Sequence, residues 1–140
     1  MAKLMSTEEF LELAPKKLMW VVKKGFRRAK ELEKISPTTA TLVYCGKNVA
    51  FEFSLDVRDQ CIDAEVIKVK YGRLLRNLDG GYSSGIYNHL VKKEGYRGSP
   101  TGTQAHLPET SKLDQAIDGW VSLLDTAGSN LLEDEAGTFD

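Results

Sequence analysis

Apolar and polar residues alternate through three successive segments between Thr39 and Lys70, and this pattern constrains the fold more than any other feature of the chain. Successive side chains of a β-strand point to opposite faces of the sheet, so alternation is typical of a strand with one buried face. The connection between the second and third segments is the most polar of this region: Asp56-Val57-Arg58-Asp59-Gln60. The sequence therefore predicts a three-stranded antiparallel meander with a charged turn.

Each predicted strand has its own pattern. The first is expected at residues 40–45, before a tight turn at residues 46–48, because the Gly and Asn of that turn favour short hairpins. The second places four apolar side chains on one face: Val49, Phe51, Phe53 and Leu55. The third, at residues 61–70, changes phase between Val66 and Ile67, and either a β-bulge or burial on both faces would explain the change.

A helical layer is predicted before the sheet. Ser6 or Thr7 can cap a helix N-terminus, and Glu9 completes a capping box with Ser6. Pro15 fits the first turn of a helix, so we expect it to interrupt the first helix and to begin a second one. The apolar face of the second helix consists of Leu18, Val21, Val22 and Phe26. This layer is expected to cover the apolar face of the meander.

Further segments have helical character. Gly25 is expected to end the second helix, and residues 27–34 have a helix-forming composition with few apolar residues, so their state stays open. Two helices are predicted after the sheet, the first of which bears Ile86, Leu90 and Val91. The last helix has the clearest amphipathic face, and we expect its Trp120 to belong to the core. That face consists of Leu113, Ala116, Ile117, Trp120, Leu123 and Leu124.

These elements define the α+β class, with an N-terminal helix packed on an antiparallel meander of three or more strands and two C-terminal helices after it. A chain of 140 residues with 41% hydrophobic and 28% charged residues is typical of one globular domain. We predict a single domain over residues 1–132 and an acidic, flexible tail over residues 133–140. Cys45 and Cys61 lack the spacing of a zinc site or a disulfide framework, so free thiols are expected.

The cellular location is predicted from the distribution of apolar residues. No apolar run approaches the roughly 20 residues that span a bilayer. The first residues also lack the apolar core of a signal peptide. We therefore expect a cytoplasmic protein that is not associated with a membrane.

The net charge of −1 hides a strong asymmetry along the chain. Residues 1–50 carry ten Lys or Arg and five Asp or Glu, whereas residues 101–140 carry one Lys and eight acidic residues. Opposite charges at the two ends can steer a charged partner. They can also let the basic first helix and the acidic last helix lie side by side, within the fold or across a dimer. The second interpretation is the simpler one.

The charged turn is the strongest candidate site. Asp56, Arg58 and Asp59 place two carboxylates and one guanidinium in a short connection. Such a group can stabilise the turn through an ion pair, bind a basic partner, hold a metal ion or serve in acid–base chemistry. The turn-stabilising interpretation is favoured and recognition of a partner comes next. No second cluster of potential ligands supports a metal site.

A second candidate is the Gly- and Ser-rich segment at residues 79–85, which contains Tyr82. Glycines before a helix can present backbone N–H groups to an anion, but this segment lacks the arrangement of a P-loop or a dinucleotide-binding fingerprint. Tyr82 is kept as a candidate binding residue. His89 and His106 fall in different predicted elements, and no nucleophile signature is present. We therefore predict no catalytic residue, no metal site and no cofactor.

The basic first helix is the best argument for nucleic-acid binding. It contains Trp20 and a series of cationic residues: Lys16, Lys17, Lys23, Lys24, Arg27, Arg28, Lys30 and Lys34. Against this, the isoelectric point is about 6.1 and no strand carries the aromatic pattern of an RNA-recognition motif. Exposed helical lysines are most often simply solvated, so nucleic acid is not the favoured partner.

Residues 8–70 resemble small bacterial α+β proteins of uncharacterised families, some of which are similar to toxin-immunity proteins. The resemblance is carried by a helical segment that ends in Gly25-Phe26, a strand hairpin, and the Asp56-x-Arg58-Asp59 turn. It implies a binding protein whose acidic and aromatic surface positions grip a partner, with no catalysis and no cofactor.

Three functions are therefore expected in order of preference. The first is a non-enzymatic protein-interaction module, immunity-like or homodimeric, with Asp56, Arg58, Asp59 and Tyr82 as candidate binding residues. The second is a small-ligand enzyme that uses Asp56 and Asp59, which requires a deep pocket beside the turn. The third is nucleic-acid binding through the basic helix, which should weaken steeply with salt.

Overall fold

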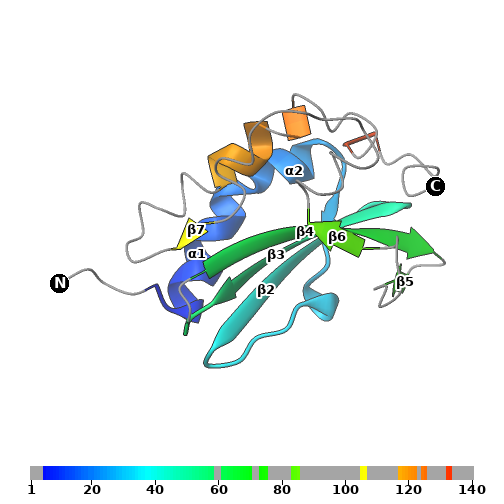
Figure 1. Ribbon diagram of the computed structural model, residues 1–140. Helices are drawn as coiled ribbons and strands as arrows, with labels where there is room; N and C mark the ends of the chain where they lie inside the picture. Colours follow the sequence, from blue (N-terminus) through cyan, green and yellow to red (C-terminus); the bar gives the residue numbers. More distant parts are fainter. Residues whose placement is uncertain are drawn as a thin grey trace.

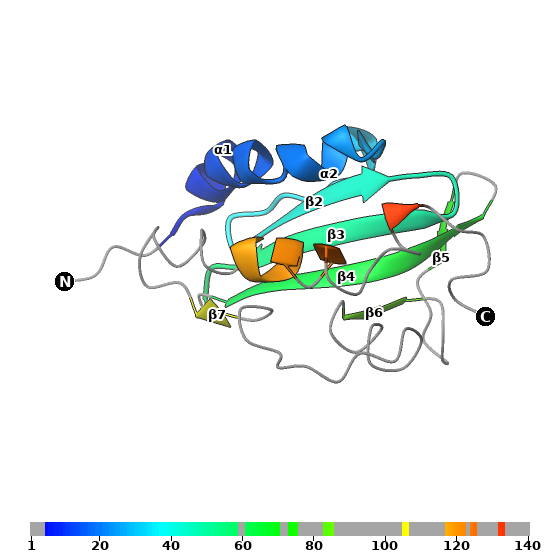
Figure 2. The ribbon, with the colours of Figure 1, turned by 90° about the horizontal axis from the view of Figure 1, so that it is seen from above.

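The computed structural model describes residues 5–58, 61–70, 73–75, 83–85, 105–106, 117–122, 124–125 and 132–133. These residues form one antiparallel sheet with helices packed on one of its faces (Figures 1 and 2). The predicted α+β class and the N-terminal helical layer are confirmed. The division at residues 132 and 133 stays a prediction, since most of the expected tail lies outside the described residues.

The helices and strands follow one another in a simple order. The helices α1 (Thr7–Lys17) and α2 (Met19–Lys23) precede the sheet, and the short 3₁₀ helix η1 (Lys30–Leu32) lies between its first two strands. The first strands are β1 (Arg27–Arg28), β2 (Thr39–Cys45), β3 (Val49–Asp56) and β4 (Cys61–Lys70). Three short strands complete the sheet: β5 (Arg73–Leu75), β6 (Ser83–Gly85) and β7 (Ala105–His106).

The predicted meander is present as the antiparallel ladder β2-β3-β4. Phe53 of β3 lies opposite Leu42 of β2 and Ala64 of β4. The strand order continues from β1 to β5, while β6 and β7 pair with β4 beside β5. All these pairs are antiparallel, so the charged turn after Asp56 belongs to a hairpin.

The change of phase in β4 is explained by burial on both faces of the sheet. The register between β3 and β4 continues without interruption past the change, with Phe51 opposite Val66 and Ala50 opposite Ile67. Val66 belongs to the main core under the helices, whereas Ile67 belongs to a second apolar cluster with Ala50. A β-bulge is therefore not needed.

Helix α1 begins as predicted and ends later than predicted. The Ser6 hydroxyl accepts a hydrogen bond from the backbone N–H of Glu9 at 3.1 Å. Pro15 lies inside α1, and the chain departs from the helix only at Leu18, so the predicted break at Pro15 is wrong. A proline removes one helical hydrogen bond, but buried Phe10 and Ala14 before it and buried Leu18 after it hold this segment on the sheet.

Gly25 ends the second helix, as predicted. It has a φ of 106°. The N–H of Phe26 bonds to the carbonyl of Val21 and the N–H of Gly25 bonds to the carbonyl of Val22, which is the pattern of a Schellman motif. Phe26 and Val21 are both buried, whereas Val22 is 39% exposed. The predicted helical face was therefore wrong at Val22, which faces solvent, and at Phe26, which follows the helix.

Residues 27–34, whose state was left open, form β1 and then η1 rather than an α-helix. Arg27 and Arg28 pair with Cys45 and Tyr44 at the outer edge of β2. The positive φ of Gly25 turns the chain toward that edge, so the helix-forming composition of this segment is overridden by its pairing with the sheet.

The main core lies between the helices and the sheet. Its ring contacts centre on Phe53, whose centroid lies 5.4 Å from that of Trp120, 6.0 Å from that of Tyr44 and 6.5 Å from that of Phe51. Phe51 in turn lies 5.0 Å from Phe26. These contacts join β2, β3, Phe26 and the C-terminal helical segment in one apolar cluster.

The C-terminal part of the fold is described at residues 117–122 and 124–125, which are helical. Ile117, Trp120 and Leu124 are buried, so the predicted role of Trp120 as a core residue is confirmed. This segment lies on the same face of the sheet as α1 and α2 (Figures 1 and 2). The other predicted C-terminal helix, with Ile86, Leu90 and Val91, lies outside the described residues.

Replacing Gly25 with Ala is expected to destabilise the fold by about 1 kcal/mol, because a Cβ is strained at positive φ. No atom lies within 4 Å of the added Cβ, so backbone strain is the only cost. Chemical denaturation measures the change. Gly25→Asn is the control and should cost less, because Asn tolerates this region better; equal stability of wild type and Gly25→Ala would contradict the assignment.

Candidate functional site

The two faces of the sheet have different environments. Helices cover one face (Figure 1). The side chains that alternate with the core residues point to the other face, because successive side chains of a strand point to opposite sides. Near the end of the sheet that contains the β2-β3 turn, this second face is apolar and buried, with Ala50, Ile67 and Val69 packed beside Cys45 and Leu74. Toward the opposite end, near Asp56, it is polar. We call this polar part the open face.

The open face contains a solvent-facing hollow of about 430 Å³. Three carboxylates, three hydroxyl groups and one ammonium group contribute to its lining, so the formal charges give an excess of two negative charges. Such a surface suits a ligand that carries positive charge and hydrogen-bond donors. The lining residues are Lys34, Thr39, Thr41, Glu52, Ser54, Leu55, Asp56 and Asp63.

The strand register brings the polar residues of the hollow together. Ser54 lies directly opposite Thr41 on one side and Asp63 on the other, and Asp56 lies opposite Thr39. Directly opposite side chains have Cβ atoms about 5 Å apart, so these groups can contact one ligand together. Each of these five side chains alternates with buried residues of the main core, which fixes its direction.

Two glutamates add to the negative charge of this face. Glu52 of β3 lies directly opposite Glu65 of β4, and both side chains are half-buried. Like charges opposite each other in an antiparallel pair are unfavourable in themselves. The pair contributes two carboxylates to the polar part of this face.

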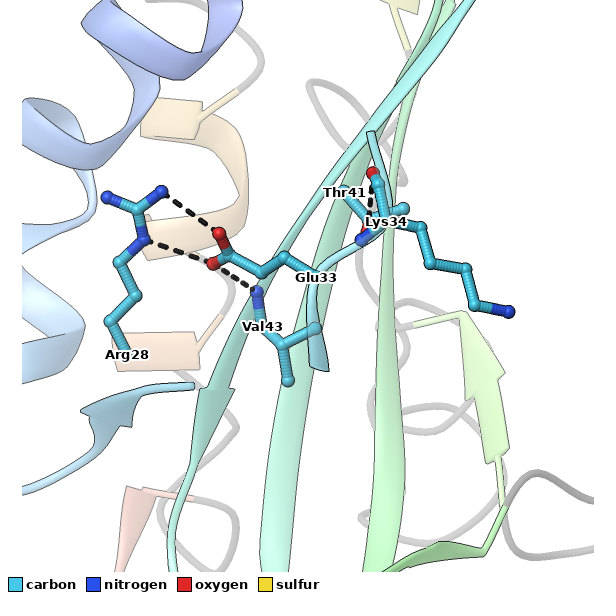
Figure 3. Close-up of polar contacts among 5 residues, drawn as sticks. All are labelled: Arg28, Glu33, Lys34, Thr41 and Val43. Atoms are coloured by element: carbon cyan, nitrogen blue, oxygen red, sulfur yellow. Dashed lines mark hydrogen bonds and ion pairs between the residues drawn. The ribbon is translucent and has the colours of Figure 1, made fainter. Parts of the chain in front are cut away.

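The segment at residues 34–39 forms the rim of the hollow. It is held against β2 by backbone and hydroxyl hydrogen bonds. The Thr41 hydroxyl accepts from the backbone N–H of Lys34 at 2.7 Å and donates to the carbonyl of Lys34 at 3.2 Å (Figure 3). The Ser36 hydroxyl accepts from the backbone N–H of Thr39 at 3.0 Å and lies 2.9 Å from the Thr39 hydroxyl. These contacts fix the segment that carries Lys34 against β2, so the rim is already ordered without a ligand.

The outer edge of β2 is closed by a buried ion pair. Both oxygens of Glu33 accept hydrogen bonds from Arg28, each at 3.0 Å, and one of them also accepts from the backbone N–H of Val43 at 3.1 Å (Figure 3). The Glu33 side chain is 4% exposed and that of Arg28 is 25% exposed. Hydrogen bonding to Glu33 raises the pKa of Arg28 further above its usual value. The carboxylate takes the place of a strand carbonyl and supports the segment that forms the rim.

Tyr44 is a buried polar residue in the core beside this ion pair. Its hydroxyl oxygen is inaccessible to solvent and has no hydrogen-bond partner within the described part of the chain. Burial raises the pKa of Tyr44 to about 12, and the nearby Arg28 guanidinium opposes this shift. The hydroxyl is therefore a destabilising feature of the core, and it does not face the hollow.

The structure brings one of the predicted site residues into the hollow. Asp56 lines it, whereas Arg58 is exposed in the turn and is not a lining residue. Asp59 and Tyr82 lie outside the described residues. An ion pair between Arg58 and Asp59 in the turn therefore stays a prediction.

Several lining residues were not predicted from the sequence. Glu52 and Ser54 share the face of Asp56 in β3, and this alternation was visible in the sequence. Asp63 joins them only through the β3-β4 register, which could have been found by pairing the two strands around the charged turn. Lys34 comes from a segment whose position depends on the ion pair of Glu33, and no local pattern indicates it.

Metal binding and covalent catalysis receive no support from the described residues. Among them, no group of three or more His, Cys, Asp or Glu side chains could hold a metal ion. Cys45 is a half-buried, reduced cysteine on the covered, apolar half of the second face. None of the described helices is long and apolar enough to span a membrane.

No protein-family model matches the chain, and neither a curated protein nor a solved structure matches it significantly. The resemblance to immunity-type proteins consequently stays a prediction. The residues of the site are therefore the basis for a functional proposal.

Replacing Glu33 with Ala is expected to destabilise the protein by about 2 kcal/mol, because the largely buried guanidinium of Arg28 and the N–H of Val43 would lose their acceptor. Glu33→Gln should cost less, since its amide oxygen can still accept from Val43. Chemical denaturation measures both variants.

The control is Glu31→Ala. Glu31 forms an ion pair with Arg27 at 2.7 Å, but both side chains are more than half exposed, so stability should hardly change. Equal effects of Glu31→Ala and Glu33→Ala would contradict the role of Glu33 at the edge of β2.

Replacing Tyr44 with Phe is expected to stabilise the protein by about 1 kcal/mol at neutral pH, because a buried hydroxyl without a partner is removed. The unfolded phenol loses its proton near pH 10, while the folded one keeps it to about pH 12. The stability of the wild type should therefore fall between these values, by at most about 1.4 kcal/mol per pH unit from this group. Denaturation across this range should show a smaller decrease for Tyr44→Phe; parallel curves would contradict the burial of the hydroxyl.

Proposed function

We propose that this chain is a non-enzymatic protein-interaction module that binds a basic segment of a partner protein in the hollow of the open face. The observation that carries the proposal is the composition of the hollow, in which Glu52, Asp56 and Asp63 stand beside three hydroxyl groups. Carboxylates attract Lys and Arg side chains and accept their hydrogen bonds, and the hydroxyls add further acceptors. The acidic lining supports a binding role, and the immunity-type resemblance implies a binding protein with acidic and aromatic surface positions.

Preorganisation favours binding at this position. The residues of the hollow come from β2, β3 and β4, whose opposite sides pack in the main core, and from a rim fixed by hydrogen bonds. Rigid strands of this kind lose little conformational entropy when a ligand binds. A basic segment that crosses the strands can therefore contact the three carboxylates without a rearrangement of the fold.

A small cationic ligand is the second candidate, because the volume of about 430 Å³ lies within the range of small-molecule sites. The three carboxylates of the hollow are distributed over β3 and β4, so a segment with several cationic side chains can contact more of them than one small cation can. The protein partner is therefore preferred. The small-ligand enzyme predicted from the sequence would use Asp56 together with Asp59, and Asp59 lies outside the described residues.

The test is a binding titration with a fluorescent, Arg- and Lys-rich peptide at low and high ionic strength. We expect binding to weaken with salt, and the double variant Asp56→Asn/Asp63→Asn to bind about tenfold more weakly, which corresponds to about 1.4 kcal/mol. Asparagine retains the shape of both side chains. It also keeps the oxygen of residue 63 that accepts from the N–H of Ala64.

The matched control is Asp118→Asn/Asp125→Asn, which removes the same charge from two exposed positions of the C-terminal helical segment. It should change the affinity by less than about twofold, since these charges are screened from the hollow. Equal weakening by both double variants would contradict binding at the hollow. A small diamine that displaces the peptide and binds more tightly would favour the small-ligand alternative.

A further inference from the structure

A basic surface lies on the opposite side of the molecule from the hollow. Helices α1 and α2 pack with one side on the sheet, and their other side faces solvent (Figures 1 and 2). We define the basic patch as the exposed residues Lys16, Met19, Val22, Lys23 and Lys24. No acidic residue occurs in the sequence between Glu12 and Glu31. The basic patch and the acidic hollow therefore carry complementary charges and lie on opposite sides of the sheet.

The basic patch also exposes apolar side chains. Met19 is 53% exposed and Val22 is 39% exposed. The ammonium of Lys24 lies 5.3 Å from the ring centroid of Trp20, so a cation–π contact keeps this charge at the surface of α2. Apolar side chains within a ring of charges are typical of a protein-binding surface. Met19 is well suited to this role because its side chain adapts to different partners.

We propose that the basic patch of one copy of this chain docks in the hollow of a second copy. The inference rests on the proposed function, because it uses the same hollow, and it identifies a second copy as a basic partner. The patch has three lysines, Lys16, Lys23 and Lys24, and the hollow of the second copy has three carboxylates to pair with them. The methyl groups of Thr39 and Thr41, which also line the hollow, offer apolar contact to Met19 and Val22.

The dimensions of the two surfaces agree. From Lys16 to Lys24 the helical segment extends about 12 Å, at roughly 1.5 Å per residue. The hollow spans three strands, which is about 10 Å across at the usual strand spacing, and the carboxylates of β3 lie about 13 Å apart along the strand. The net charge of −1 leaves little overall repulsion between copies.

Other occupants of the patch are less well matched to these side chains. Nucleic-acid phosphates would pair with the lysines and leave Met19 and Val22 without apolar contact. A bilayer would require a wider apolar face than these two side chains, because Leu18 and Val21 are already buried in the core. Both remain outcomes of the test.

The geometry determines the kind of assembly. The patch and the hollow lie on opposite sides of the sheet, so one pair of copies cannot use both contacts reciprocally. The contact is heterologous, and repetition of it produces open chains or rings rather than a closed two-fold dimer. Association should weaken with salt because it depends on exposed charges.

The experiment uses two charge-reversal variants and analytical ultracentrifugation. Lys16→Glu/Lys23→Glu reverses the patch, leaves the hollow intact and keeps the contact between Lys24 and Trp20. Asp56→Lys/Asp63→Lys reverses the hollow and leaves the patch intact. We expect the wild type to form species larger than a dimer at low ionic strength as its concentration rises, and each variant alone to be monomeric.

An equimolar mixture of the two variants is the decisive sample. In it the intact patch of one variant can enter the intact hollow of the other, and the reversed patch and the reversed hollow are again opposite in charge. Association should therefore reappear in the mixture, although neither variant associates alone. A wild type that stays monomeric at every concentration, or that forms only a closed dimer, would overturn the inference. Binding of the basic peptide to monomeric wild type would then still support the proposed function, so the two failures can be told apart.

Neutral variants serve if a reversed chain does not fold. Lys16→Gln/Lys23→Gln and Asp56→Asn/Asp63→Asn should each weaken wild-type association about tenfold at low ionic strength. Folding is checked by circular dichroism. If the patch instead binds duplex RNA or phosphatidylserine vesicles while the wild type does not self-associate, the inference is overturned in favour of those partners.

Discussion

The packing around Phe53 is the interaction on which the rest of the structure depends. Its ring contacts Tyr44 of β2, Phe51 of β3 and Trp120 of the C-terminal helical segment, so it joins the sheet to the helical layer. A shift of β3 by one residue would turn this ring toward solvent and bring its polar neighbours into the core. The same constraint that buries Phe53 therefore directs Glu52 and Ser54 to the open face. The hollow is a direct consequence of how the core is packed.

The edges of the meander explain why its face, rather than its backbone, is available for binding. β7, β6 and β5 pair in turn with the outer side of β4. At the outer side of β2, the backbone groups are paired with β1, with the Glu33 carboxylate and with the backbone of Lys34. Occupied edges disfavour the addition of a further strand from a partner. Recognition through the sheet must then use side chains on a face, and the helices already cover the other face.

The sequence predicted the parts of the fold that depend on short-range patterns. Alternation in β3 and the N-cap at Ser6 depend on neighbouring residues, and both are present in the structure. The break predicted at Pro15 was wrong because the apolar contacts of α1 with the sheet outweigh the local cost of proline. In the candidate site, Asp56 was identified from local charge density, whereas Asp63 required the register of β4. Glu33 could not be identified at all, because its partners Arg28 and Val43 meet it only in the folded chain.

The uneven distribution of charge along the chain has two separate structural consequences. Arg28 is used inside the fold, where Glu33 neutralises it and where it supports the edge of β2. Lys16 and Lys23 are exposed on α1 and α2, and Asp118 is exposed on the C-terminal helical segment of the same layer. These charges are hydrated, so they contribute little to stability and act mainly through the field outside the protein. Because exposed lysines gather from the end of α1 through α2 and carboxylates outnumber cations in the hollow, the charge is distributed unequally over the two sides of the sheet. A net charge close to zero therefore gives a poor description of how this protein meets a charged partner.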